Sequence, residues 1–161
     1  MTTKDYNQCV NDYSDALYRY LSRMYTDQEM ARDVVQSVFE KLWIKRDELN
    51  LREVKSYLFT MARNKAIDVW RKNKRIISIQ EHHDRVELNK AKSFEDMDYV
   101  NYCLRELNEN QKSILLLREY EGHSYEDIAE ITGMTLSQIK INLFRARKKV
   151  MNTVKKKSRA I

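Results

Sequence analysis

Cations and hydrogen-bonding side chains gather in two parts of this sequence, and both patterns suit a polyanionic partner. In residues 57–75, six cations stand against the single acid Asp68, with aromatic residues among them: Arg63, Lys65, Arg71, Lys72, Lys74 and Arg75. Cations beside aromatic rings suit unstacked bases, which lie on a ring while their phosphates are neutralised. The alternative is that the rings of Tyr57, Phe59 and Trp70 belong to the core and the cations only solubilise the helix.

The second basic part follows Glu130, after which no acidic residue occurs. From Thr135 on, apolar residues recur at three- and four-residue spacing, which predicts a helix with one buried face: Ile139, Leu143, Ala146 and Val150. The opposite face is polar and basic: Ser137, Gln138, Lys140, Asn142 and Arg145. The sequence therefore predicts a helix that presents cations and hydrogen-bonding groups outward.

The chain has two glycines, Gly122 and Gly133, and they bracket one short segment. Glycine is favoured where the backbone takes a positive φ, as at a helix C-terminus, so we predict a helix end at each. Ser124 and Thr135 each follow one of these ends and have an acid or amide three positions later, which is typical of helix N-caps. The segment is predicted to be a helix-turn-helix, which delivers its second helix into a DNA major groove. A solvated helical hairpin with a basic tail is the alternative.

Composition limits the fold class and the kind of partner. The chain has 161 residues, no proline and a formal net charge of +6. So few helix breakers favour helix almost everywhere, and the charge favours nucleic acid or an anionic membrane surface as partner. Because no apolar run approaches the roughly 20 residues of a membrane span, and the first residues lack a signal-peptide core, we expect no membrane insertion and a cytoplasmic protein.

No pattern typical of catalysis or of a bound cofactor occurs in the sequence. We find no Gly-rich phosphate loop and no nucleophile–base–acid arrangement. The lone Cys9 and Cys103 and the three histidines lack the spacing of metal ligands. We therefore predict a binding protein, not an enzyme, with no cofactor and no metal.

Hydrophobic periodicity divides the chain into two small helical domains. Residues 7–76 are predicted as a bundle of three helices, the second opened by a capping box at residues 26–29. Residues 77–97 are acidic and lose the periodicity, which predicts a flexible linker. Residues 98–158 form the second domain, in which Asn108 and Gln111 predict another helix N-cap before the helix-turn-helix. The predicted fold class is all-α, with two small helical domains joined by a linker.

Four stretches then resemble one known family. Residues 31–43, 57–68, 115–129 and 139–147 occur in the order and spacing of bacterial sigma factors of the extracytoplasmic-function (ECF) type, a likeness that spans about 13–149. The last two stretches are shared with response-regulator output domains, whereas the first two are more specific. The resemblance implies a promoter-specificity subunit of RNA polymerase whose first domain is sigma region 2 and whose second is region 4. Its implied partners are the β′ clamp helices and the β flap of core polymerase, promoter DNA and an anti-sigma factor.

The resemblance also assigns residues to three contacts. The core-polymerase contact is expected at Asp33, Gln36, Phe39, Glu40 and Trp43. The minus-10 contact is expected at Arg63, Asn64, Lys65, Asp68, Arg71 and Lys72, with a pocket for a captured base partly built by residues 46–54. The minus-35 contact is expected at Ser137, Gln138, Lys140, Ile141, Asn142, Phe144 and Arg145.

Two residues depart from the family's pattern, and two other functions stay open. Asn108 stands where many members have proline, and Asn142 where many have a cation. Asparagine can still hydrogen-bond adenine edges, although the family's usual base contacts lose a cation there.

A stand-alone helix-turn-helix regulator with an N-terminal sensing or dimerisation domain would not bind core polymerase. A helical interaction protein would bind an acidic partner or an anionic membrane without sequence preference.

Overall fold

The computed structural model describes residues 1–25, 27–80 and 96–159, and all regular structure within these ranges is helical. The first domain contains α1 (Thr3–Tyr25), α2 (Gln28–Ile44) and α3 (Leu51–Gln80). The second contains α4 (Asp96–Leu104), α5 (Glu109–Leu115), the π-helical turn η1 (Leu116–Tyr120), α6 (Tyr125–Thr132) and α7 (Leu136–Arg159). The predicted all-α class is confirmed. Among the described residues, no helix is both long enough and apolar enough to cross a membrane.

Helix starts in the first domain follow local capping chemistry. Asp27 is the N-cap of α2, and its side chain accepts the backbone N–H groups of Glu29 and Met30 at 3.0 and 3.3 Å. Asn50 and Glu53 cap α3 reciprocally, each side chain accepting the other's backbone N–H. Of the capping box predicted at 26–29, position 26 lies outside the described residues. α3 runs to Gln80, four residues past the predicted boundary at 76, and most of the predicted linker also lies outside the described residues.

The helix-turn-helix is built as its glycines and caps predict. Gly122 and Gly133 have φ values of +70° and +73°, and Gly133 ends α6 in the left-handed region. The Ser124 hydroxyl accepts the backbone N–H of Asp127 at 3.0 Å and so opens α6. Because α6 has only eight residues, α7 follows it after one tight turn.

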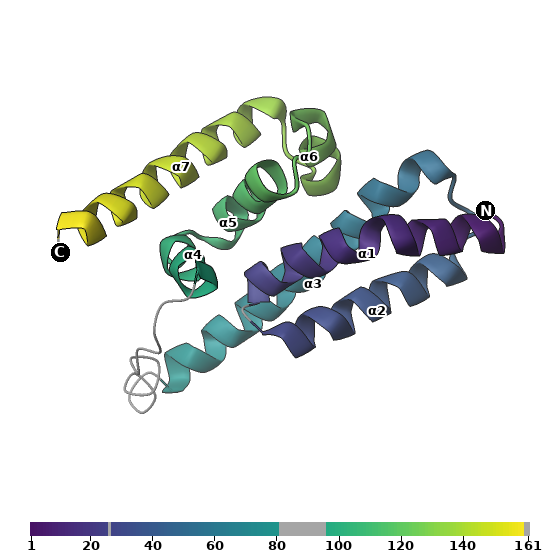
Figure 1. The fold of residues 1–161 in the computed structure, drawn as a ribbon, viewed down its shortest axis with the longest axis horizontal. Coiled ribbons are helices and arrows are strands. Elements are labelled where there is room, and N and C mark those ends of the chain that lie inside the picture. Colours follow the sequence, from purple (N-terminus) through teal and green to yellow (C-terminus); the bar gives the residue numbers. More distant parts are fainter. Residues whose placement is uncertain (26, 81–95, 160–161) are drawn as a thin grey trace.

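A single core joins the two domains. Figure 1 shows α1, α2 and α3 running side by side, with the second domain lying along α1 and α3, and the two ends of the chain far apart. One cluster of buried residues runs through both halves, from Leu21, Leu42 and Leu58 to Ile114 and Leu143. The edge of the Phe59 ring in α3 meets the His123 ring before α6, with ring centroids 4.5 Å apart. The two predicted domains therefore form one packed body in this structure.

Candidate nucleic-acid and polymerase interfaces

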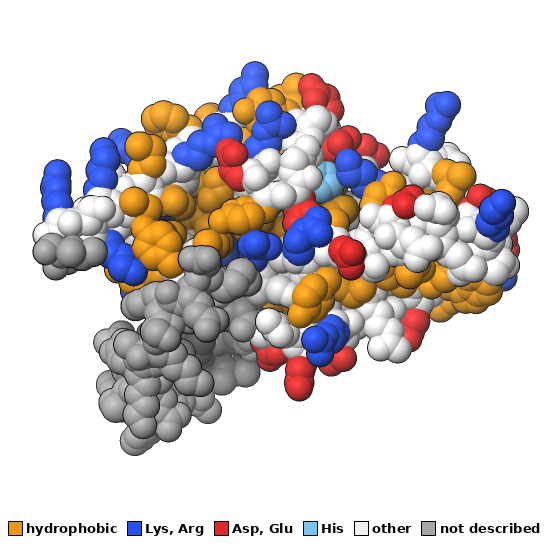
Figure 2. Space-filling model, viewed as in Figure 1, with side chains coloured by type: hydrophobic (Ala, Val, Ile, Leu, Met, Phe, Trp, Pro, Cys, Tyr) orange, Lys and Arg blue, Asp and Glu red, His pale blue; other side chains and the backbone are white. Residues whose placement is uncertain are grey.

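The face of α7 that was predicted to meet DNA is exposed. Ile139, Leu143 and Ala146 are at most 1% exposed and hold the helix against the core. On the other side Lys140 and Arg145 are exposed, and the apolar Ile141 and Phe144 are 49% and 67% exposed. In Figure 2, Lys and Arg side chains follow α7 along its length, with hydrophobic side chains between them. α7 thus presents a face with both cations and apolar groups to solvent.

Two polar residues of this face are already engaged within the helix. Gln138 and Thr135 form a reciprocal cap: the backbone N–H of Gln138 reaches the Thr135 hydroxyl at 3.1 Å, and that of Thr135 reaches the Gln138 amide oxygen at 2.9 Å. The Asn142 amide donates to the Gln138 carbonyl at 2.8 Å. Ser137 is exposed, so within the predicted set Ser137, Lys140 and Arg145 are the polar groups that α7 leaves open for a partner.

On α3, five of the six residues predicted for the minus-10 contact are exposed: Asn64, Lys65, Asp68, Arg71 and Lys72. They follow the helix for about two turns, so they form one strip. Arg71 is ion-paired with Glu109 of α5, with Nε 3.7 Å from the carboxylate. The strip therefore lies next to the second domain.

Arg63, the sixth residue, is buried. It is only 7% exposed, and its guanidinium donates to the Ser113 hydroxyl at 3.1 Å and to the Asn110 amide oxygen at 2.8 Å, both in α5. Burial lowers the pKa of this guanidinium below its usual value, since a charge in a poorly solvated site is disfavoured. In this arrangement Arg63 is turned toward the second domain and cannot meet DNA.

The residues predicted to dock on polymerase line α2. Asp33, Gln36 and Glu40 are exposed, and the Gln36 amide donates to the Glu40 carboxylate at 3.4 Å. Phe39 is only 6% exposed and belongs to the core, so it positions the helix and is not free to touch a partner. Trp43 is 37% exposed.

The Trp43 ring is held in place by two residues, Tyr6 of α1 and Arg46, which follows α2. The edge of the Tyr6 ring meets it with centroids 4.9 Å apart, and the Arg46 guanidinium lies 3.9 Å from its centroid. Arg46 also donates to the Trp43 carbonyl at 2.7 Å. A partly exposed ring held in this way is a rigid contact surface, because little rotamer freedom remains to be lost on binding.

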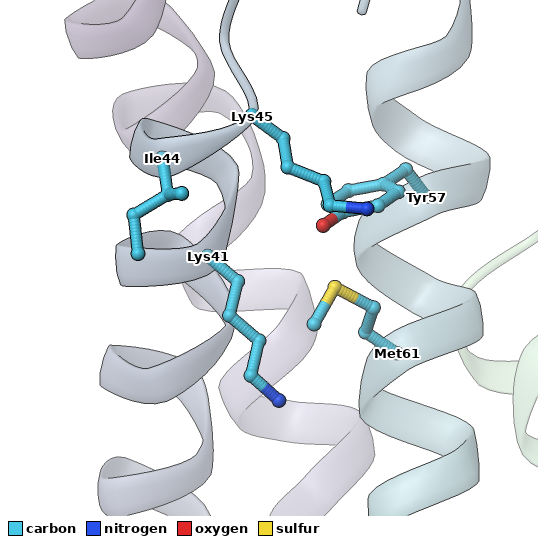
Figure 3. Close-up of a pocket in the computed structure, with 5 residues that line it drawn as sticks. All are labelled: Lys41, Ile44, Lys45, Tyr57 and Met61. Carbon is cyan, nitrogen blue, oxygen red and sulfur yellow. The ribbon is translucent and has the colours of Figure 1, made fainter. Parts of the chain in front are cut away.

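A pocket opens between the end of α2 and α3, and sequence reasoning missed most of its residues. It has a volume of about 330 Å³ and is lined by Lys41, Ile44, Lys45, Tyr57 and Met61. In Figure 3, Lys45, the C-cap residue just after α2, and Tyr57 from α3 point toward each other across the opening, and Met61 points from α3 toward α2. The signal was present in the sequence as two lysines four positions apart at the end of one helix, and Tyr57 and Met61 four positions apart on the next helix. None of these residues falls in the stretch 46–54 that was expected to help build a base pocket.

Family comparisons match both halves of the chain. The family Sigma-70 region 2 matches residues 9–76, and the family Sigma-70, region 4 matches residues 97–150. The RNA polymerase sigma factor SigV of Bacillus subtilis is 31% identical over 142 residues, which cover 87% of this chain and 85% of that protein. The ECF RNA polymerase sigma factor SigM of the same organism is 27% identical over 143 residues, covering 86% and 88%.

Solved structures share the arrangement of the whole chain. The sigma factor RpoE, in a co-crystal with the anti-sigma factor NepR from Bartonella quintana, superposes with a TM-score of 0.76 at 26% identity, over 95% of this chain and 98% of that one. CnrH, solved with the cytosolic domain of CnrY, has the same fold, with a TM-score of 0.75 at 19% identity, over 96% and 90%. Since both regions match in order and the relatives span nearly the full length, the chain belongs to the sigma-70 family and is a sigma factor of the ECF type.

Proposed function

We propose that this sigma factor directs core RNA polymerase to promoters by using three helices for three contacts. α2 docks on the β′ clamp helices, α3 and the neighbouring pocket bind the opened minus-10 element, and α7 reads the minus-35 element. Region 4 also touches the β flap. The protein performs no bond chemistry itself and acts in the cytoplasm, where polymerase meets the chromosome. An anti-sigma factor is a further partner, as it is for the RpoE relative solved with NepR.

The two-sided character of α7 carries the DNA-binding part of the proposal. Its buried stripe fixes the helix, and its outer face is free to enter a major groove. Arg145 and Lys140 suit phosphates or guanine edges, while the exposed Ile141 and Phe144 suit thymine methyl groups. Because the Gln138 side chain caps the helix, we assign base reading to the positions after it.

The pocket between α2 and α3 suits a base taken out of its stack. Tyr57 and Met61 offer apolar surface for the base, and Lys41 and Lys45 lie at the opening, where they can neutralise the neighbouring phosphates. We assign this pocket to a base of the opened minus-10 strand. Replacing one base of a bound single strand by 2-aminopurine tests the assignment, because its fluorescence changes when it is unstacked. Lys45→Ala is expected to weaken strand binding, and an unchanged affinity contradicts the assignment.

Docking on polymerase is tested with a matched pair of double variants. Gln36→Ala with Glu40→Ala removes an exposed, hydrogen-bonded pair on α2. Gln8→Ala with Asp12→Ala removes the same kind of pair on α1, where the amide donates to the carboxylate at 2.8 Å. We expect the α2 variant to lose co-purification with sigma-free core polymerase and the α1 variant to keep it. Equal binding by both variants contradicts docking through α2.

Promoter recognition is tested by transcription with core polymerase from a library of genomic fragments. Discrete new start sites are expected with this chain and not without it. On the promoter found, Arg145→Ala should lower the slope of log affinity against log salt by about one, as for one lost phosphate contact, and Lys4→Ala on α1 should leave it unchanged. Binding to specific duplex DNA without binding to core polymerase would instead identify a stand-alone regulator.

A further inference from the structure

The basic face of α7 continues well beyond the residues assigned to the minus-35 element. The match to Sigma-70, region 4 ends at residue 150, whereas α7 runs as one unbroken helix to Arg159. Its second half carries four exposed cations, which we call the distal cations: Lys148, Lys155, Lys156 and Arg159. At 1.5 Å of rise per residue, α7 is about 36 Å long and the distal cations extend about 21 Å past Arg145.

The distal cations lie on the same face of α7 as the predicted minus-35 contact. From Arg145, steps of three, four, three and four residues lead to Lys148, Asn152, Lys155 and Arg159. Residues three and four apart share one face of a helix. All five of these side chains are exposed. One continuous surface thus extends from the recognition positions to the end of the helix.

Contacts with α4 hold this part of α7 in place. Val150 of α7 and Val100 of α4 are both half-buried and pack against the core. The Lys157 amine lies 4.5 Å from the centroid of the Tyr99 ring and 5.2 Å from that of the Tyr102 ring, both in α4. A cation is attracted to the face of an aromatic ring at such distances. Since Lys157 is turned toward α4, the distal cations project from the opposite side of α7 in a fixed orientation.

The distal cations lack a counter-charge within the described chain. Over residues 1–25, 27–80 and 96–159, none of them takes part in an ion pair. Other cations of α7 are engaged: Arg147 pairs with Glu119, and Lys149 donates to the Gln111 amide oxygen at 3.1 Å. Like charges three and four positions apart on a helix repel each other. A partner that carries a row of negative charges would relieve this repulsion.

We propose that the distal cations form a second DNA contact, which binds backbone phosphates of the duplex beside the minus-35 element and reads no bases. This inference rests on the proposed function of α7. The major groove is about 12 Å wide, so a straight helix about 36 Å long cannot lie in it throughout. The last turns of α7 leave the groove, where Lys and Arg side chains meet phosphates. Such contacts fix the position of the protein and add affinity without sequence preference.

The surroundings of the distal cations favour DNA over an anionic membrane. A helix that lies on a membrane inserts an exposed apolar face beside its cations. The apolar face of α7 is instead packed against the core through Leu143, Ala146 and Val150. Met151 is 56% exposed, but a single side chain supplies little apolar surface for insertion. The exposed face of this half of α7 is therefore mainly charged, as suits phosphates in water.

The first test compares two double variants of the full chain, each of which loses one lysine and one arginine. Lys155→Gln with Arg159→Gln removes two distal cations, and Lys4→Gln with Arg32→Gln removes two exposed cations of the first domain. Each protein is titrated with a fluorescein-labelled duplex of mixed sequence at several salt concentrations. In the distal variant, the slope of log affinity against log salt should become shallower by about two. Between about 50 and 200 mM salt, the wild type should then lose about tenfold more affinity than this variant.

The first-domain variant should keep the slope of the wild type. An unchanged slope in the distal variant overturns the proposal, and so does an equal change in both variants, which would reflect net charge alone. Vesicles of phosphatidylglycerol test the membrane as partner. If the distal variant loses binding to these vesicles but keeps the wild-type slope on DNA, the distal cations contact a membrane and the proposal is wrong.

The second test locates the contact on promoter DNA. A duplex with the minus-35 element in its middle is shortened by about one helical turn at one end or at the other. At one of the two ends, shortening should weaken binding several-fold for the wild type and for the first-domain variant. The distal variant should respond little, because its contact is already lost. Equal responses by the wild type and the distal variant at both ends contradict a contact beside the minus-35 element.

The phosphate contact and the proposed function fail in different ways. If Arg145→Ala makes the slope shallower and the distal variant does not, only the assignment of the distal cations is wrong. If the distal variant makes the slope shallower while the wild-type chain neither binds core polymerase nor directs transcription, the phosphate contact stands and the proposed function is wrong.

Discussion

Acid is expected to destabilise the protein through His123. The imidazole is 2% exposed and lies edge-on against the Phe59 ring, at the junction of the two domains. Burial and, to a smaller extent, the nearby Lys55 cation together lower its pKa to about 4, against the opposing effect of the Asp127 carboxylate. The Arg118 guanidinium, bonded to the His123 carbonyl, is a further cation at this site. His123 is therefore neutral in the native protein at pH 7.

The sign and the size of the effect follow from the two pKa values. The unfolded chain has the ordinary histidine value of 6.5, so between 6.5 and about 4 the unfolded state binds more protons than the native state. The stability that comes from neutral His123 is complete above pH 6.5 and is lost as the pH falls toward 4. The loss is about 1.4 kcal/mol for each pH unit below 6.5, so between pH 7 and pH 5 it amounts to about 2 kcal/mol.

Urea unfolding at pH 7 and pH 5 measures this loss, and His123→Leu is the control, because leucine cannot take up a proton. The loss in the wild type minus the loss in the variant isolates His123, since all other titrating groups are common to both proteins. We expect a difference of about 2 kcal/mol. If both proteins lose the same free energy of unfolding, the imidazole is not held neutral by its burial and the reasoning is refuted.

Three further outcomes are expected. Burial lowers the pKa of Lys112 from 10.5 to about 8, so between these pH values the unfolded state binds more protons and the free energy of unfolding should rise with pH. Lys112→Met removes the buried charge and should raise the free energy of unfolding at pH 7, measured in urea, by up to about 3 kcal/mol. A Cβ added at Gly133 would meet nothing within 4 Å, but the new residue would have to adopt a φ of +73°. Gly133→Ala should therefore lower the free energy of unfolding by about 1 kcal/mol in thermal unfolding, and Gly133→Asn by less. Leu143→Ala should lower the free energy of unfolding by about 2–5 kcal/mol, because Leu143 is only 1% exposed. Phe144→Ala should lower it by less than about 0.5 kcal/mol, because the neighbouring Phe144 is 67% exposed. Phe144→Ala should nevertheless weaken minus-35 binding in a duplex DNA titration, and equal stability losses for the two variants contradict the assigned faces of α7.

Much of the fold was predictable because its signals are local. The positive φ of Gly122 and Gly133, the caps at Asn108 and Ser124, and the buried stripe of α7 each depend on residues within a few positions of one another. Helix periodicity and capping act within one or two turns, so neighbouring sequence contains the information. Even here the details differ: the predicted cap at 26–29 is carried by Asp27, and the helix before Gly122 ends in a π-helical turn.

The candidate sites were predicted less completely, because exposure depends on what packs against a helix. Periodicity places Arg63 on the same basic segment as Lys65, yet one is buried and the other exposed. The pocket was missed because its two walls come from different helices, with Lys41 on α2 and Tyr57 on α3. Phe39 was assigned to a partner contact and lies in the core.

The sequence by itself determined most of the helices, their caps and turns, the buried and exposed faces of α7, and the family. Only the tertiary structure decided how the two domains meet. Arg63 and Ser113 are 50 positions apart, and Tyr20 and Ser113 are 93 apart. No local pattern relates residues at such separations, since their pairing depends on the fit of whole surfaces from two domains. For that reason the sequence predicts which residues suit DNA, whereas the packing decides which of them are exposed: Arg63 is buried and Lys65 is exposed.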